Sequence, residues 1–127
     1  MKPKRITFVE SPFTHPTKSR EDCVRYALWA CVDATQRGEC VFASHLFYTQ
    51  FLPEDRLCRE WGLVCRDMLA KATVAQIARY VDIGQTPGMF RDIDCTAEVV
   101  TRKLEGAARE GWLAGTWPDG SLRPVVW

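Results

Sequence analysis

Apolar and polar residues alternate along the chain in a way that separates short β-rich runs from longer amphipathic segments. The first apolar run, Ile6 to Val9, stops at Ser11-Pro12, which predicts a strand followed by a loop. Ser19 with Asp22 three residues later resembles a capping box, and apolar residues then recur at helical spacing as far as Arg37-Gly38. We therefore expect a strand, a loop and a helix in this part of the chain.

The middle of the chain repeats this order. Cys40 to Ala43 is a second strand candidate, and it leads into the polar and aromatic segment Ser44 to Gln50. Pro53 suits the start of a helix whose apolar residues fall at helical spacing; they are Leu57, Trp61, Val64 and Met68. Val74 to Val81 fits both a strand and a helix. We assign it as a strand, because a helix would leave the acidic turn that follows without a role.

The last third of the chain predicts one more helix and one more strand. Thr86-Pro87 is typical of a helix cap and first position. The apolar face of that helix is expected to hold Ile93, Ala97, Val100, Leu104 and Ala107, and the helix is expected to end near Gly111. Trp112 to Trp117 then predicts a last strand, and Pro118-Asp119-Gly120 predicts a turn. The tail 112–127 is expected to form a strand or a hairpin.

This alternation of strands and helices with short connections predicts an α/β fold. We expect a three-layer α/β/α architecture, Rossmann-like or flavodoxin-like, with a parallel sheet of four to five strands. The length of 127 residues, of which 46% are hydrophobic, fits one domain over 1–127. Ligands of such sheets bind beyond the carboxyl ends of the strands. The expected site therefore gathers Ser11 to His15, Ser44 to Tyr48, and Asp82 to Asp92.

Composition and charge exclude several classes of partner. Seventeen Lys and Arg against sixteen Asp and Glu give a formal net charge of +1, so we expect neither an extended nucleic-acid surface nor a membrane surface as partner. The apolar run after the basic start is too short for a signal peptide, and no run reaches the length needed to span a membrane. We expect a cytoplasmic protein.

Six cysteines raise the question of a disulfide or metal framework. They contain no Cys-x-x-Cys pair, and His15 and His45 are not spaced with any cysteine pair. We interpret the cysteines as reduced and mostly buried small apolar residues. A dinucleotide fingerprint and a P-loop are also missing from the sequence. We therefore expect no metal site and no cofactor.

The segment Asp82 to Met89, followed by Asp92, is the strongest candidate for binding chemistry. It combines a carboxylate, a glycine-containing turn and a helix start, where backbone amides attract anionic or polyhydroxyl groups. The same residue types are also ordinary turn and cap chemistry. Asp92 is equally well explained as a solvated residue in the first turns of a helix.

Four segments in this order resemble the nucleoside 2-deoxyribosyltransferase-like superfamily, and especially its small bacterial and phage members. The matching segments are Val9 to Phe13, Tyr26-Ala27, Arg37 to Tyr48, and Asp82 to Met89. The resemblance extends to about Ala108 and leaves out the C-terminal tail. Active members cleave or transfer across the N-glycosidic bond of deoxyribonucleosides or their 5′-phosphates, and they commonly form dimers or larger assemblies. We therefore expect a nucleoside or nucleotide ligand and a homo-oligomer.

The resemblance also implies roles for individual residues. Asp92 takes the position of the glutamate that acts as nucleophile in active members, and Asp82 would serve as acid or as an orienting group. The substrate-binding residues implied by the matching segments are Ser11, Pro12, Phe13, His45, Tyr48, Gly84, Thr86, Pro87, Gly88 and Met89. Ordinary structural roles stay open for Ser11 as a turn residue, for His45 bonded to a backbone carbonyl, and for Tyr48 as a half-buried aromatic.

Two departures from the family pattern support alternative functions. The side chain of Asp92 is one methylene shorter than glutamate, and Phe13 stands where active members carry a tyrosine. A protein that kept the pocket but lost the chemistry would act as a nucleotide sensor or sequestering agent. A third hypothesis is a structural subunit that uses an exposed tryptophan-rich tail with Trp112, Trp117 and Trp127.

Overall fold

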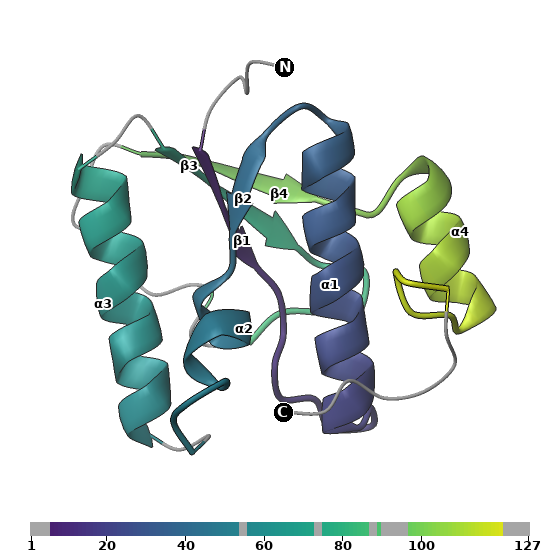
Figure 1. Cartoon of the computed structure of the whole chain (residues 1–127), viewed down its shortest axis with the longest axis horizontal. Coiled ribbons are helices and arrows are strands. Elements are labelled where there is room, and N and C mark those ends of the chain that lie inside the picture. Colours follow the sequence, from purple (N-terminus) through teal and green to yellow (C-terminus); the bar gives the residue numbers. More distant parts are fainter. Residues whose placement is uncertain (1–5, 54–55, 73–74, 87–88, 90–96, 121–127) are drawn as a thin grey trace.

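A parallel β-sheet forms the centre of the molecule (Figure 1). The computed structural model describes residues 6–53, 56–72, 75–86, 89 and 97–120. Within these residues the sheet has four strands in the order β2-β1-β3-β4, with every neighbouring pair parallel. The strands are β1 (Ile6–Glu10), β2 (Cys40–Phe42), β3 (Ala75–Tyr80) and β4 (Glu98–Arg102). The predicted α/β fold with a parallel sheet is confirmed.

Helices cover both faces of this sheet. Figure 1 shows α3 (Arg56–Ala72) on one side of the strands, and α1 (Arg20–Gln36) with α4 (Gly106–Ala114) on the other. The short helix α2 (Ser44–Tyr48) directly follows β2 at the carboxyl ends of the strands. The predicted three-layer arrangement is therefore confirmed, and it places the ends of β1 and β2 beside α2 and α3.

Local sequence signals at the two ends of α1 act as predicted. The Ser19 hydroxyl accepts a hydrogen bond from the Asp22 amide at 3.1 Å, which satisfies one of the free amides of the first turn. At the other end Gly38 takes a φ of 85°, a left-handed conformation that glycine adopts without strain. The assignment of Val74 to Val81 as a strand is also confirmed, since β3 spans Ala75–Tyr80.

The predictions for the segment after Ala97 are wrong. The expected helical face with Val100 and Leu104 is divided between two elements, because residues Glu98–Arg102 form β4 and α4 begins only at Gly106. The β-branched residues of β4 suit a strand, and β4 pairs with β3 along its whole length. The predicted Trp112–Trp117 strand is also wrong, since α4 continues to Ala114 and ends at Gly115 with a φ of 78°. Ile93 lies outside the described residues.

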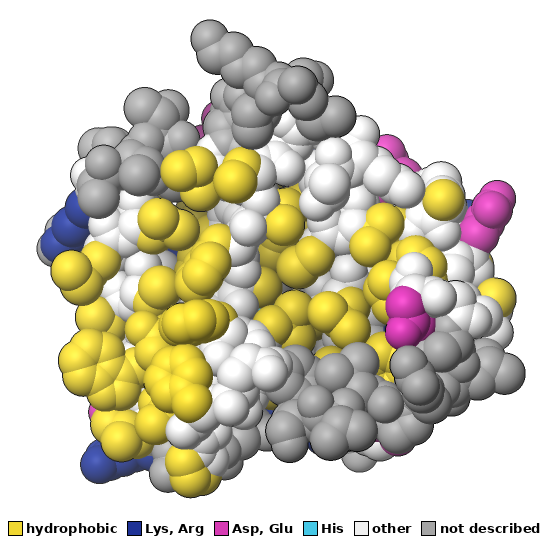
Figure 2. Space-filling view, in the orientation of Figure 1, with side chains coloured by type: hydrophobic (Ala, Val, Ile, Leu, Met, Phe, Trp, Pro, Cys, Tyr) yellow, Lys and Arg dark blue, Asp and Glu magenta, His cyan; other side chains and the backbone are white. Residues whose placement is uncertain are grey.

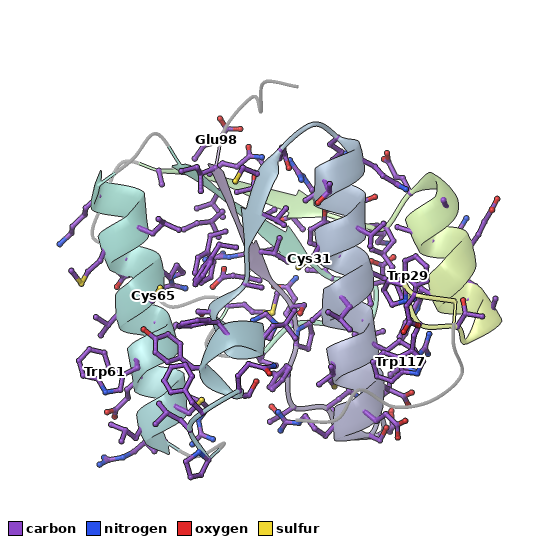
Figure 3. All side chains as sticks on the ribbon, viewed as in Figure 1. Trp29, Cys31, Trp61, Cys65, Glu98 and Trp117 are labelled. Atoms are coloured by element: carbon purple, nitrogen blue, oxygen red, sulfur yellow. The ribbon has the colours of Figure 1, made fainter. Side chains whose placement is uncertain are left out.

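Tryptophans join α1 to α4 rather than forming an exposed tail (Figure 3). The Trp29 indole is 9% exposed, and its Nε1 donates to the Thr116 carbonyl at 2.7 Å. Trp117 is buried, and the Trp112 ring contacts Tyr26 at a centroid distance of 5.1 Å. The exposed tryptophan-rich tail is therefore wrong for Trp117, and Trp127 lies outside the described residues.

The cysteines within the described residues are free thiols. Cys23 and Cys58 are buried, as predicted, but Cys40 is exposed at the edge strand β2. Burial raises the pKa of the Cys31 thiol to about 12. The described part of the chain holds no group of three or more His, Cys, Asp or Glu side chains arranged to bind a metal ion. In the same residues, every helix is too short or too polar to cross a membrane.

Gly111 lets α4 approach α1 closely, and we expect Gly111→Ala to destabilise the fold. A Cβ at this position would lie 2.2 Å from two atoms of the Trp29 ring, whose indole is held by its hydrogen bond to Thr116. Overpacking of this kind costs about 1–3 kcal/mol, which exceeds the gain of up to about 1 kcal/mol in helix propensity. Urea unfolding measures the change. Trp29→Phe should recover part of the loss in the double variant, and additive effects of the two changes would contradict the contact.

Candidate functional site

A cavity of about 670 Å³ lies where the carboxyl end of β1 meets α2 and the N-terminal half of α3. Its polar lining includes Glu10, Ser11, His45 and Thr86, and its apolar lining includes Phe8, Phe13, Leu63 and Met89. Ligand cavities in proteins have volumes of roughly 300–1,000 Å³ and commonly combine apolar walls with a few polar groups. The cavity has the size and the chemistry of a small-molecule site.

The three segments expected to converge do meet at this cavity. Ser11 and Phe13 come from the loop after β1, His45 comes from α2, and Thr86 and Met89 come from the segment after β3. Parallel strands bring the loops at their carboxyl ends to the same edge of the sheet, which explains the meeting. Five of the predicted substrate-binding residues therefore line one cavity.

The other predicted residues lie elsewhere or outside the described residues. Pro12 and Gly84 line an adjoining hollow of about 420 Å³, which shares Thr86 with the main cavity. The Tyr48 ring contacts Phe47 and Phe51 and does not line the cavity. Pro87, Gly88 and Asp92 lie outside the described residues.

His45 is the centre of a small polar group in the cavity wall. Its Nε2 is hydrogen-bonded to the Ser11 hydroxyl at 3.1 Å, and its ring meets the edge of Phe13 at a centroid distance of 4.8 Å. The Arg20 guanidinium lies over the Phe13 ring, with its central carbon 4.3 Å from the ring centroid. Burial, with a smaller contribution from Arg20, lowers the pKa of His45 to about 4. At neutral pH the imidazole is therefore uncharged, so one of its nitrogens donates a hydrogen bond and the other accepts one.

Glu10, which the sequence analysis did not select, contributes the carboxylate in the cavity wall. Its side chain is 7% exposed, and its two oxygens accept from Arg66 Nη1 at 2.7 Å and from Arg79 Nε at 3.1 Å. Arg66 is fully buried on α3, and Arg79 lies on β3. Two signals in the sequence point to Glu10: it lies within the matching segment Val9 to Phe13, and it ends an apolar run, although an acidic residue at that position most often reaches solvent.

Two arginines at the start of α3 give one side of the cavity a positive charge. Arg56 and Arg59 both line the cavity, and Arg56 is paired with Glu60 at a distance of 3.7 Å. Arg59 has no carboxylate within ion-pair distance among the described residues. This side of the cavity therefore favours an anionic group.

Asp82 does not join these residues. One carboxylate oxygen accepts a hydrogen bond from the Tyr26 hydroxyl, and the carboxylate also accepts from the Leu104 amide at 3.0 Å. Burial and the neighbouring Asp82 raise the pKa of Tyr26, so its hydroxyl stays protonated and donates. Asp82 lines a separate hollow together with Lys103 and Arg109. In this structure it connects α1 to the start of α4 and lies outside the cavity.

His15 also has a structural environment. Its Nε2 bonds to the Ile83 carbonyl at 2.8 Å, and its Nδ1 accepts from the Lys18 amide at 3.0 Å. These bonds tie the loop after β1 to the loop after β3. His15 therefore fixes the position of two segments that line the cavity and the adjoining hollow.

The lowered pKa of His45 predicts a pH-dependent stability. Between pH 6.5 and about 4 the unfolded chain binds a proton at His45 that the folded chain does not, so the free energy of unfolding falls as the pH falls through this window. Between pH 7.5 and pH 4.5, we expect the free energy of unfolding to fall by about 2 kcal/mol less in His45→Gln than in the wild-type protein. Urea unfolding at pH 7.5 and pH 4.5 measures the difference. An identical pH dependence in both proteins would contradict the neutral, partly buried imidazole.

Comparison with known proteins gives a family. A family model described as "Domain of unknown function (DUF7768)" matches residues 5–103, which run from β1 to just beyond β4 and include the described residues that line the cavity. No curated protein and no solved structure matches the chain. Because the family model covers well over half of the sequence, the chain belongs to the DUF7768 family.

Proposed function

We propose that this protein binds a nucleoside or nucleotide in the cavity beside α3. The observation that carries the proposal is the meeting of three loops in a single cavity of about 670 Å³. The residues expected from the resemblance to the deoxyribosyltransferase-like superfamily supply five of the lining side chains. A nucleoside monophosphate fits a volume of this order.

The chemistry of the walls suits the parts of such a ligand. Phe13 and Met89 offer apolar surface for a base. Ser11, His45 and Thr86 offer hydrogen-bond donors and acceptors to sugar hydroxyls or base edges. Since the His45 ring is uncharged at neutral pH, it recognises a neutral part of the ligand by hydrogen bonding rather than a phosphate by charge.

Arg59 is the residue best placed to recognise a phosphate. It borders the cavity next to Arg56, and Arg56 already has Glu60 as its partner. An arginine offers several donors in a plane that matches two phosphate oxygens. We therefore propose that a 5′-phosphate is bound on the α3 side and that the nucleoside extends toward Phe13.

Binding is tested by calorimetry with a panel of deoxynucleosides and their 5′-monophosphates. We expect Arg59→Ala to weaken the binding of a monophosphate by about 10-fold to 100-fold, because a charge-assisted hydrogen bond contributes about 1.5–3 kcal/mol. Binding of the matching nucleoside should change little. The control is Arg109→Ala, which removes an exposed arginine at a different hollow.

Two results would contradict this proposal. One is the absence of binding at millimolar concentrations for every member of the panel. The other is an equal loss of affinity in Arg59→Ala and Arg109→Ala, which would show a general effect of net charge. Binding of inorganic phosphate alone with the full affinity would remove the nucleoside part of the proposal.

We propose cleavage or transfer at the N-glycosidic bond as a second candidate function. The observation that favours it is the Glu10 carboxylate in the cavity wall, next to Ser11. Two arginines donate hydrogen bonds to this carboxylate, Arg66 at 2.7 Å and Arg79 at 3.1 Å, and they hold it in a fixed position at the cavity wall. Glu10 is thus a rival to Asp92 for the role that the resemblance gives to a carboxylate.

The reaction has two requirements that the cavity must meet. A carboxylate attacks or stabilises the anomeric carbon as the bond to the base breaks, and the departing base takes up a proton from an acid. Water or a second base then takes the sugar. This cavity offers Glu10 for the first requirement, while the neutral His45 and Ser11 pair relays a proton only if another group supplies it.

Base release is tested by incubating the protein with the same panel and separating free base by chromatography. We expect Glu10→Gln to lower the rate at least 100-fold if Glu10 is the reacting carboxylate, while Asp92→Ala lowers it if Asp92 is. Circular dichroism and calorimetry on each variant separate lost chemistry from lost folding or binding. Release that persists in both variants would contradict both carboxylates as the reacting group, and no release in the wild-type protein would contradict an enzymatic function and leave the binding function standing.

A further inference from the structure

Helix α3 carries an exposed apolar face that the fold does not use. We call it the α3 stripe. It consists of Leu57, Trp61, Val64 and Met68, whose exposed fractions are 52%, 49%, 41% and 65%. These four residues were predicted as one helical face, and they are one. The exposure of Trp61 and Met68 excludes this face from the core.

The α3 stripe is distinct from the face of α3 that packs on the rest of the molecule. Cys58 and Arg66 are buried, and Gly62 lies against α2, where its carbonyl accepts a hydrogen bond from the Ser44 hydroxyl at 3.2 Å. Figure 3 shows Trp61 projecting away from the body of the protein. One face of the helix is therefore covered by the rest of the molecule, and the α3 stripe is a second face that is exposed.

Aromatic residues of α2 and of the turn after it extend this surface. Phe47 is 48% exposed and Phe51 is 58% exposed, and their rings contact each other at a centroid distance of 5.2 Å. Figure 2 shows hydrophobic side chains gathered over α3 and α2 on this side of the molecule. Monomeric soluble proteins rarely expose continuous apolar areas of this kind, which more often mark an interface.

We propose that a second copy of the chain covers the α3 stripe, with the two α3 helices antiparallel about a twofold axis near Gly62 and Leu63. The order of the stripe supports this occupant. In an antiparallel pair centred there, Trp61 of one copy faces Val64 of the other, and Leu57 faces Met68. The large indole then meets a small side chain in both halves of the contact, so the stripe is complementary to itself, as a twofold interface requires.

The exposed apolar area of this surface can be compared with the area that each partner buries in a stable dimer. An aromatic side chain buries about 150–250 Å² in full, so the half-exposed Trp61, Phe47 and Phe51 contribute roughly 300 Å² per copy, to which Leu57, Val64 and Met68 add. Standard interfaces bury about 800 Å² per partner, so these six side chains form the apolar centre of such an interface. Charged side chains beside the stripe are compensated within their own chain, Glu60 by Arg56 at 3.7 Å and Asp67 by Arg66 at 3.1 Å. They form the polar rim that such interfaces have.

Sedimentation of the full chain over a range of concentrations tests the dimer. We expect the wild-type protein to be a dimer and Trp61→Glu to raise the dissociation constant more than about 30-fold, as expected for an aromatic residue at the centre of an interface. The control is Leu113→Glu, which places the same charge on an apolar residue of α4 that is 67% exposed. It should leave the dimer intact. A wild-type monomer at all concentrations, or an unchanged dimer in Trp61→Glu, would overturn the proposal.

Cysteine cross-linking tests the antiparallel register. In a background without Cys31, Cys40, Cys65 and Cys95, we expect a mixture of Leu57→Cys and Met68→Cys chains, which keep the central Trp61, to form a disulfide-linked dimer under mild oxidation faster than either chain alone. The reason is that only the mixture places the two thiols face to face. Equal rates in all three samples would overturn this register.

Discussion

A positive charge buried within the fold determines how this molecule is assembled around its cavity. The Arg66 side chain is fully buried, so its charge needs a partner inside the protein, and it finds the Glu10 carboxylate at the end of β1. Arg79 on β3 binds the other oxygen of the same carboxylate. Breaking such a group by removing one member typically costs about 3–5 kcal/mol. Helix α3 is therefore held in a fixed position over the carboxyl ends of the two central strands, and the cavity is the space left between them.

Other carboxylates perform the same structural task on the opposite face of the sheet. Asp33 accepts from the Tyr80 hydroxyl at 2.5 Å and from the Glu105 amide at 3.0 Å, and Asp82 accepts from Tyr26 and from the Leu104 amide. These two carboxylates fix the entry to α4 at the end of β4. Carboxylates thus join helices to strand ends on both faces of the sheet. Asp82, which the resemblance gave a catalytic role, is one of these structural carboxylates. Glu10 differs because its position also borders the cavity.

Local sequence signals predicted most of the helices and strands, but they did not predict those of the last third of the chain or all the residues that line the cavity. β1 and α1 follow from an apolar run, a serine cap and a glycine after the helix. β3 was assigned correctly only because a helix there would leave the acidic turn after it without a role. Val100 and Leu104 are four residues apart whether they belong to one helix or to a strand and the turn after it, so spacing alone misled the assignment of β4. The contact between Glu10 and Arg66 joins residues 56 positions apart, and no short pattern predicts it. Periodicity also found the α3 stripe without revealing that it faces outward, since buried and exposed apolar faces repeat in the same way.

Helix α3 borders the cavity on one side and presents the α3 stripe on another. Arg56, Arg59 and Glu60 line the cavity, and Leu57 and Trp61, which lie on the same two turns, belong to the stripe. The ion pair of the buried Arg66 with Glu10 holds this helix against the end of β1. Energetic linkage between two surfaces requires an element that can take two positions, and this ion pair opposes such a movement of α3. The stripe and the cavity are therefore separable surfaces of one helix, so that a substitution in either one tests that surface alone.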